Sequence, residues 1–333
     1  MSDTRSRKPT IIEVARLADV SHQTVSRFFR APDGLKPATR QRVEEAIREL
    51  NYRPNLVARS MRTRRTGRLA VVLPALTYNP ARMLAGASAA AVSAGYAIDV
   101  VSHEGGISER TKRVLDLAES GQVEGILSLA PLLPTAENPA QSTTVTVSAD
   151  FDDDMRGVGA LADGSPVREL VSGLAQRGHR RFLHVTGALD FASARGRRDV
   201  FLQAIEDFGL ESVGVFEGDW SGESGMAAMA SLTDDMLPTA VIAANDLVAA
   251  GVMRGAWGRG WTVPGDISVT GWDNNPVGAF MAPTLTTVDV DLERLGRDAM
   301  SSLVAALRGE TAAKPPPSLH RVVWRESTAP LAR

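Results

Sequence analysis

The beginning of the chain contains two short amphipathic stretches joined by a tight turn, and this pattern limits the possible folds more than any other feature. Thr10 and Glu13 have the spacing of a capping box, in which each side chain accepts a hydrogen bond from the other residue's backbone amide, so a helix is predicted to begin there. Asp19 is predicted to end that helix, because aspartate tolerates the left-handed conformation of a tight exit. Ser21 is the predicted N-cap of a second helix, which extends to about residue 30.

The second predicted helix has an apolar side and a polar side. Val25, Phe28 and Phe29 share the apolar side. The polar side carries side chains that can bond to the edges of bases, namely His22, Gln23, Ser26, Arg27 and Arg30. A solvated helix face could carry the same residue types. A third helix, predicted from Arg40 to Leu50, completes a helix-turn-helix unit and favours a DNA-binding function.

The charges of the chain are segregated. Residues 1–68 contain 16 Lys and Arg against 7 Asp and Glu, a balance of +9, whereas the remaining 265 residues have a balance of −11. A basic segment attracts phosphate, and an acidic one is repelled by it. The N-terminal part is therefore the predicted nucleic-acid-binding part.

A short segment follows the third predicted helix. Pro54 and Asn55 can start a helix there, with room for only about seven residues, whereas isolated helices shorter than roughly 12 residues are marginal in water. This helix needs a surface to fold against. DNA together with a second copy of the chain would provide that surface.

From Leu69 onward, short apolar runs alternate with helical stretches, which predicts parallel sheets built from βαβ units. So many strands favour two doubly wound halves over one very wide sheet. The predicted strands are 69–73, 96–101, 125–129, 182–185, 240–244 and 267–270. Ligands of such folds bind beyond the carboxyl ends of the strands.

Several function classes are excluded by the sequence. The chain has no cysteine, and its five histidines are scattered, so we predict no metal and no cofactor. Neither an apolar run of about 18 residues nor a signal sequence is present, which predicts a cytoplasmic, nucleoid-associated protein. No nucleotide-binding glycine motif and no nucleophile with its base were found, so an enzyme is not expected. A cytoplasmic sugar-binding protein or a sugar-modifying enzyme remains the alternative.

The N-terminal sequence closely resembles the lactose/galactose repressor family. The resemblance is carried by Thr10-Ile-Ile-Glu-Val-Ala-Arg-Leu-Ala-Asp-Val-Ser-His-Gln-Thr-Val-Ser-Arg and Tyr52-Arg-Pro-Asn-Leu-Val-Ala-Arg-Ser-Met. It implies that His22, Gln23 and Arg27 read bases in the major groove, and that the helix after Tyr52-Arg-Pro-Asn is a hinge helix that orders on the operator. Met61 replaces the leucine that relatives insert into the minor groove. The predicted DNA-binding residues are Thr10, Ser21, His22, Gln23, Ser26, Arg27, Arg30, Asn55, Ala58, Arg59 and Met61.

The resemblance extends over the rest of the chain through patterns such as Ser193-Ala-Arg-Gly-Arg, Ala244-Asn-Asp and the closing Arg325-Glu-Ser-Thr-Ala-Pro. It implies a periplasmic-sugar-binding-protein architecture with an effector cleft between two subdomains. The matching effector-binding residues are Asn79, Pro80, Asp163, Ser193, Arg197, Trp220, Asn245 and Asp273. Such polar groups and an indole face suit a carbohydrate. A planar purine is less expected, since Ala81-Arg82 stands where many relatives have aromatic residues.

Other residues near these motifs have structural interpretations. Asp246 is predicted to cap a helix, Arg195 and Arg198 to be surface charges, and Trp272 to lie in the core.

These observations predict an all-α helix-turn-helix domain in residues 1–53, a hinge helix and linker in 54–66, and an α/β effector-binding and dimerisation domain in 67–333. The two subdomains are predicted to comprise residues 67–163 with 290–317, and 164–289 with 318–330. The predicted protein is a homodimeric repressor that binds a pseudo-palindromic operator. A small molecule, expected to be a sugar, would alter operator affinity by binding one conformation better than another.

Overall fold

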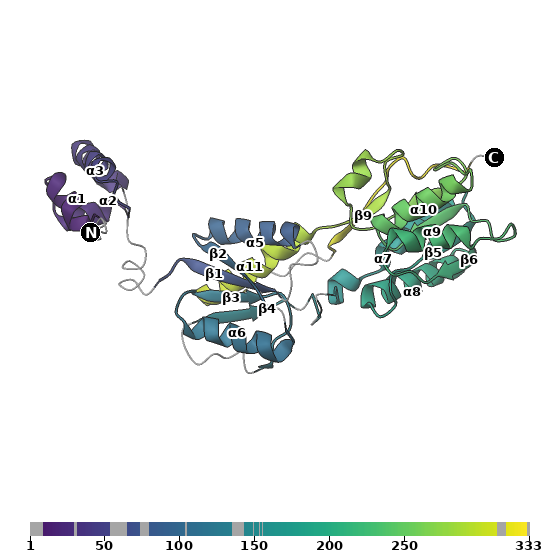
Figure 1. Ribbon diagram of the computed structural model, residues 1–333, viewed down its shortest axis with the longest axis horizontal. Helices are drawn as coiled ribbons and strands as arrows, with labels where there is room; N and C mark the ends of the chain where they lie inside the picture. Colours follow the sequence, from purple (N-terminus) through teal and green to yellow (C-terminus); the bar gives the residue numbers. More distant parts are fainter. Residues whose placement is uncertain are drawn as a thin grey trace, which may run out of the picture. The chain divides into compact units, whose positions relative to one another are not determined.

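The structure is a computed structural model of the 333-residue chain. It describes residues 9–29, 32–53, 65–73, 80–103, 105–134, 143–148, 150–152, 154, 156–311 and 318–331. The chain forms two compact units, Met1–Thr66 and Gly67–Arg333 (Figure 1). The predicted hinge helix lies outside the described residues, as do the predicted site residues Arg30, Asn55, Ala58, Arg59, Met61 and Asn79.

The first unit begins as the sequence predicts, with α1 (Ile11–Leu17), α2 (His22–Phe28) and α3 (Pro37–Glu49). The capping box at Thr10 is confirmed, since the Glu13 amide donates to Thr10 Oγ1 over 3.3 Å and the Thr10 amide donates to Glu13 Oε2 over 2.6 Å. Asp19 has φ 51°, the predicted left-handed conformation. Ser21 caps α2 by accepting from the amide of Thr24 over 3.2 Å. Local side-chain chemistry therefore fixes both helix starts.

The third helix begins three residues earlier than predicted. Pro37 occupies its first turn, where the fixed φ of proline suits a helix and the missing amide would have no helical partner. The three helices enclose a small core, whose buried members are Val14, Ala15, Ala18, Val25, Val43, Ala46 and Tyr52.

The described residues of the second unit form two four-stranded parallel sheets. The first has the strand order β2-β1-β3-β4 and consists of β1 (Arg68–Leu73), β2 (Ala97–Ser102), β3 (Gly125–Ser128) and β4 (Thr144–Val147). Its central strand β1 is buried on both faces. Leu69, Val71 and Leu73 pack in the cluster that includes α5 (Ala81–Ser93) and α11 (Leu292–Arg308), whereas Ala70 and Val72 pack with α6 (Ile107–Glu119). Figure 1 shows α5 and α6 on opposite sides of this sheet.

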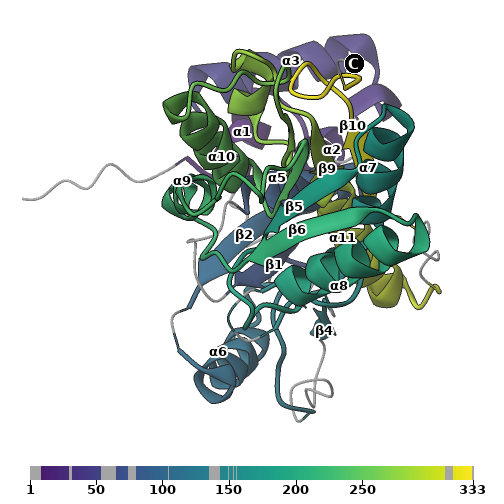
Figure 2. The same cartoon turned by 90° about the vertical axis from the view of Figure 1, so that its right-hand side faces the viewer.

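The second sheet has the order β6-β5-β7-β8 and consists of β5 (Arg181–Val185), β6 (Glu211–Phe216), β7 (Ala240–Ala243) and β8 (Ser268–Thr270). Phe182 faces the side of α7 (Ser165–Gln176) and α8 (Ala192–Asp207). Leu183 and Val185 face α9 (Gly222–Ala230) and α10 (Asp246–Gly258). Figure 2 shows α8 on one side of β5 and β6 and α10 on the other.

A two-stranded antiparallel sheet completes the described fold, formed by β9 (Thr287–Val290) and β10 (His320–Val323). The six predicted strands are confirmed, each within one residue at either end. The strands β4, β6, β9 and β10 were missed, because they are short or only partly buried and lack a continuous apolar run. Among the described residues, no helix has both the length and the apolar character needed to cross a membrane.

Candidate DNA-binding surface and effector pocket

The polar side of α2 is presented to solvent. His22, Gln23 and Arg27 are exposed and Ser26 is half-buried, whereas Val25 on the opposite side is fully buried. Two predicted DNA-binding residues hold the helix starts instead of pointing freely outward. Thr10 is engaged in its capping box, and the Ser21 hydroxyl is 3.0 Å from that of Thr24. The surface can therefore present three or four base-reading groups from one rigid helix.

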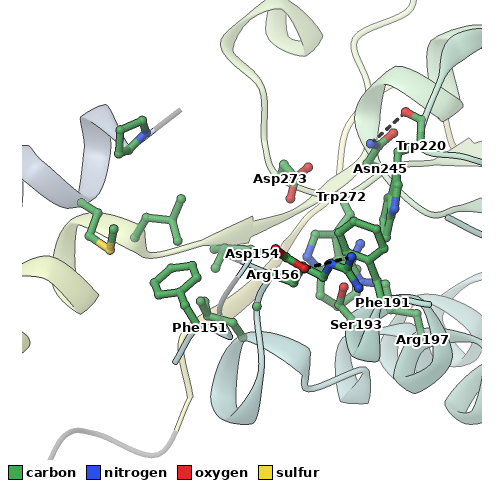
Figure 3. Close-up of a pocket in the computed structure, with 16 residues that line it drawn as sticks. Phe151, Asp154, Arg156, Phe191, Ser193, Arg197, Trp220, Asn245, Trp272 and Asp273 are labelled. Carbon is green, nitrogen blue, oxygen red and sulfur yellow. Dashed lines mark hydrogen bonds and ion pairs between the residues drawn. The ribbon is translucent and has the colours of Figure 1, made fainter. Parts of the chain in front are cut away.

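A pocket of about 320 Å³ lies in the second unit (Figure 3). Predicted site residues reach it from the segments that follow the strands of the second sheet, as expected for parallel sheets. Ser193 follows β5, Trp220 follows β6, Asn245 follows β7 and Asp273 follows β8. The complete lining is Pro80, Met83, Phe151, Asp154, Arg156, Gly157, Leu161, Phe191, Ser193, Arg197, Trp220, Asn245, Trp272, Asp273, Val290 and Leu292.

Arg197 is the central cation of the pocket and is only 7% exposed. Its Nη1 donates to the carbonyl oxygen of Ala244, and its guanidinium carbon lies 3.9 Å from the ring centroid of Trp272 and 5.6 Å from that of Trp220. Cations over indole faces are stabilised by the ring quadrupole. Trp272 is buried as predicted, at 1% exposed, but it also lines the pocket.

Asp273 carries a further charge of the pocket and is half-buried. Its φ of 98° is unusual for a residue other than glycine, and Trp220 has a φ of 72°. Such strain persists where the surrounding structure holds the backbone in place. Here the amide of Asp273 donates to Val288 over 2.9 Å. Burial raises the pKa of Asp273 to about 6, against the opposing effect of Arg197.

The interpretation of Asp246 as a helix cap is wrong. Asn245 is the N-cap of α10, where its Oδ1 accepts from the amide of Val248 over 2.7 Å. Asp246 is buried and instead accepts from the amide of Asn275 and from Thr287 Oγ1. Burial raises the pKa of Asp246 as well. Asp246 therefore supports the loop that carries Asp273.

Asn245, in turn, has two structural tasks besides lining the pocket. Its Nδ2 donates to the carbonyl oxygen of Trp220 over 3.3 Å, so it joins the loops after β6 and β7 (Figure 3).

Pro80 lines the pocket from the start of α5. Asp163 is exposed and accepts from the amide of Ser165 over 2.9 Å at the start of α7, and it is not among the described residues that line the pocket.

Ten of the sixteen described residues that line the pocket were not predicted as site residues. Phe151, Asp154, Arg156 and Leu161 come from a stretch that fits the family pattern poorly, and its aspartate run was the only signal there. Met83 and further apolar residues come from α5, β9 and α11. The pocket also has aromatic side chains from segments other than the one after Pro80, namely Phe151, Phe191, Trp220 and Trp272.

The raised pKa of Asp273 leads to a pH-dependent prediction. A folded-state pKa of about 6 against about 4 in the unfolded chain means that the folded state binds the proton more tightly. The resulting stability is present below pH 4 and is lost as the pH rises through 6. We expect Asp273→Asn to gain about 1–2 kcal/mol over the wild type at pH 7.5 and nothing at pH 4, discounting for solvent in the pocket. Urea unfolding at the two pH values measures the gain, and an equal difference at both would contradict the assignment.

Comparisons with known proteins agree with this architecture. Residues 10–55 match the family described as bacterial regulatory proteins, LacI family, and residues 171–328 match the periplasmic binding protein-like domain. The chain is 32% identical to the ribose operon repressor of Escherichia coli (strain K12) over 308 residues, which are 89% of this chain and 92% of that protein.

Two solved structures resemble nearly the whole chain. The Lac repressor dimer bound to operator and the anti-inducer ONPF has a TM-score of 0.73 and 26% identity, covering 98% of this chain and 100% of that one. The complex of the transcriptional regulator CelR with cellobiose has a TM-score of 0.60 and 28% identity, covering 96% and 99%. The chain therefore belongs to the LacI family of bacterial regulatory proteins and is a DNA-binding transcriptional regulator.

Proposed function

We propose that this protein is a repressor that binds a pseudo-palindromic operator as a homodimer and changes its operator affinity when a carbohydrate occupies the pocket. One observation carries the proposal, which is that a helix with exposed base-reading side chains and a separate polar and aromatic pocket occur in one chain. The Lac repressor acts on an operator as a dimer, and its likeness to this chain supports the same assembly here. The protein would act in the cytoplasm, on the nucleoid.

The chemistry of the pocket supports a carbohydrate effector. Ser193, Arg197, Asn245 and Asp273 offer hydroxyl, guanidinium, amide and carboxylate groups, which are partners for sugar hydroxyls. Trp220 offers an indole ring for the C–H face of a sugar. CelR binds cellobiose, which supports the same ligand class for this chain. Pro80 is proposed to contact the effector as well. Asp163 is not proposed to contact it, because its carboxylate accepts a hydrogen bond from the amide of Ser165 at the start of α7.

An apolar surface near the start of α10 supports the homodimer. Leu247 is 59% exposed, and Val277 and Phe280 in the 3₁₀ helix η4 (Pro276–Phe280) are 66% and 87% exposed. The amide of Asn275, just before η4, donates to Asp246, so these apolar side chains lie in one region. Exposed apolar patches of this kind are typical of interaction surfaces. We propose that Leu247, Val277 and Phe280 contact the second copy of the chain.

Truncation tests whether operator binding and effector binding belong to different units of the chain. We expect residues 67–333 alone to lose all operator binding and to keep effector binding, because the two compact units are separate in the chain. Operator binding would be measured by fluorescence anisotropy on DNA from the protein's genomic neighbourhood. Effector binding would be measured by thermal shift with a panel of mono- and disaccharides, since a ligand that binds only the folded state stabilises it. Retained operator affinity in the truncated protein would refute the proposal.

The side chain of Arg27 is expected to provide specificity. Arg27→Ala should weaken binding to the cognate operator by about 1–3 kcal/mol, because a bidentate contact to a base is lost, and should leave binding to random DNA largely unchanged. Arg42→Ala is a control outside α2, since Arg42 lies on α3 and pairs with Asp19 at 3.7 Å. Equal losses on cognate and random DNA for Arg27→Ala would mean that Arg27 contacts phosphate only.

A further inference from the structure

The pocket contains two guanidinium groups among its described lining residues, and the chain's own groups already engage both. Arg156 Nη2 lies 3.2 Å from Asp154 Oδ2, and Arg156 Nη1 lies 3.2 Å from Asp190 Oδ2. The guanidinium carbon of Arg156 also lies 4.7 Å from the ring centroid of Phe191. Figure 3 shows Arg156 between Asp154 and Phe191 at the pocket. Two edges of this cation therefore face carboxylates, and one face covers an aromatic ring.

The position of Arg156 is fixed by its backbone. Its amide donates to Asp152 Oδ1 over 2.8 Å, and its carbonyl oxygen accepts from the amide of Asp152 over 3.0 Å. The amide of Val158 donates to Asp150 over 2.9 Å and closes the same turn. Asp190, by contrast, belongs to the loop before α8. Arg156 thus joins two segments that are far apart in the sequence, and an incoming ligand meets it in a preset geometry.

Arg197, on α8, is held in a comparable way. It donates to the carbonyl oxygen of Ala244, and its flat face lies against Trp272. The carboxylate of Asp273 is close enough for Arg197 to lower its pKa against the effect of burial, and at neutral pH Asp273 is ionised because its pKa is about 6. The positive charge of Arg197 is therefore opposed by the negative charge of Asp273 in the same pocket.

The charged side chains of the described pocket lining balance one another, and a further carboxylate lies beside Arg156. Asp154 and Asp273 oppose Arg156 and Arg197, and Asp190, which does not line the pocket, adds its negative charge through its ion pair with Arg156. A phosphate or carboxylate group entering here would have to displace carboxylates from Arg156 and to approach Asp273. Like charges repel, and the repulsion is screened less beside the partly buried Arg156, whose side chain is 30% exposed, than in bulk water, although the side chains of Asp154 and Asp190 are themselves 70% and 58% exposed. Neutral hydroxyl groups can instead donate to the carboxylates without adding charge.

We propose that the effector of this pocket is an uncharged sugar, without phosphate, sulfate or carboxylate groups, and that Asp190 and Asp154 enforce this selectivity by occupying Arg156. The inference rests on the proposed function, in which the pocket binds a carbohydrate. It adds the charge of the effector and the residues that select for it. Arg156 is a specificity-determining residue in this account, because it would attract anions if its two partners were removed.

Inorganic phosphate is the probe, titrated calorimetrically into the full-length protein in a phosphate-free buffer. We expect no saturable heat with the wild type. The double variant Asp154→Asn/Asp190→Asn should gain phosphate binding by at least about tenfold, because two negative charges next to Arg156 are removed. Adding Arg156→Gln to that double variant should abolish the gain. The matched control is Asp199→Asn, which removes a carboxylate that pairs with Arg198 at 2.8 Å and is not part of the pocket, and it should behave as the wild type.

Two results would overturn the inference. One is saturable phosphate binding by the wild type that Arg156→Gln removes. The other is a double variant that remains folded by circular dichroism and still binds no phosphate. Both results leave operator binding untouched, so failure of the inference is distinguishable from failure of the proposed repressor function, which the truncation experiment tests.

Discussion

The double variant Leu247→Asp/Phe280→Asp is expected to be monomeric and to bind its operator about 10²- to 10⁴-fold more weakly than the wild type. Two DNA-binding domains that are joined in one dimer bind the two halves of an operator at a high effective concentration. A monomer lacks this effective concentration and therefore binds more weakly. Both residues are highly exposed in the isolated chain, so the substitution does not disturb a core. Light scattering would measure the oligomeric state, and anisotropy on operator DNA would measure the affinity.

A control variant separates the interface from a general effect of added charge. Leu202 on α8 is 44% exposed and lies outside the proposed interface, so Leu202→Asp should leave both the dimer and the operator affinity unchanged. If the double variant remained a dimer with full affinity, the interface would have to lie on another face of the protein. If Leu202→Asp alone dissociated the dimer, the interface would have to include α8.

Gly296→Ala is expected to destabilise the second unit by about 3 kcal/mol. Gly296 lies where α11 crosses α5, and a Cβ atom at this position would be 1.9 Å from the carbonyl oxygen of Met83. A Cβ atom added at Gly86, on the facing helix, would likewise be 1.8 Å from the carbonyl oxygen of Glu293. Backbone on both sides leaves no flexible side chain to move aside, so the helices would have to separate. A loss of this size is a large fraction of the roughly 5–15 kcal/mol of a typical domain.

The matched control for this substitution is expected to raise the free energy of unfolding instead of lowering it. Gly258, the last residue of α10, is exposed and has nothing within 4 Å of its added Cβ. Gly258→Ala should therefore stabilise the protein by about 0.5 kcal/mol through the lower conformational entropy of alanine in the unfolded chain. Urea unfolding followed by tryptophan fluorescence measures both variants. A destabilisation by Gly296→Ala no greater than about 1 kcal/mol would show that α5 and α11 can relax apart.

Much of the fold could be predicted because it depends on local rules. The capping box at Thr10, the left-handed Asp19 and the N-cap at Ser21 are set by a few adjacent residues, and all three are confirmed. The apolar runs of the buried parallel strands were equally clear. Edge strands such as β4 and β6 were missed, since a strand that is half exposed carries a mixed pattern like that of a loop.

The effector pocket could be predicted only in part. Residues that follow strands, such as Asn245 and Asp273, were recognisable because parallel strands bring their carboxyl ends to one edge. The hydrogen-bond partners of individual side chains were not recognisable from the sequence. Asp246 is an example, because its carboxylate accepts from Thr287, which is 41 residues away in the sequence. Arg156 and Asp190 are likewise 34 residues apart and were not predicted as a pair.

The sequence by itself determined where helices and strands begin, which face of α2 is polar and which family the chain belongs to, because these depend on neighbouring residues and on motifs that are contiguous in the chain. Only the tertiary structure decided which charges neutralise one another and which glycines permit close helix contact. Those properties depend on distances of a few ångströms between segments that are remote in the sequence, such as Gly296 and Met83 or Arg156 and Asp190, and no local pattern encodes such distances.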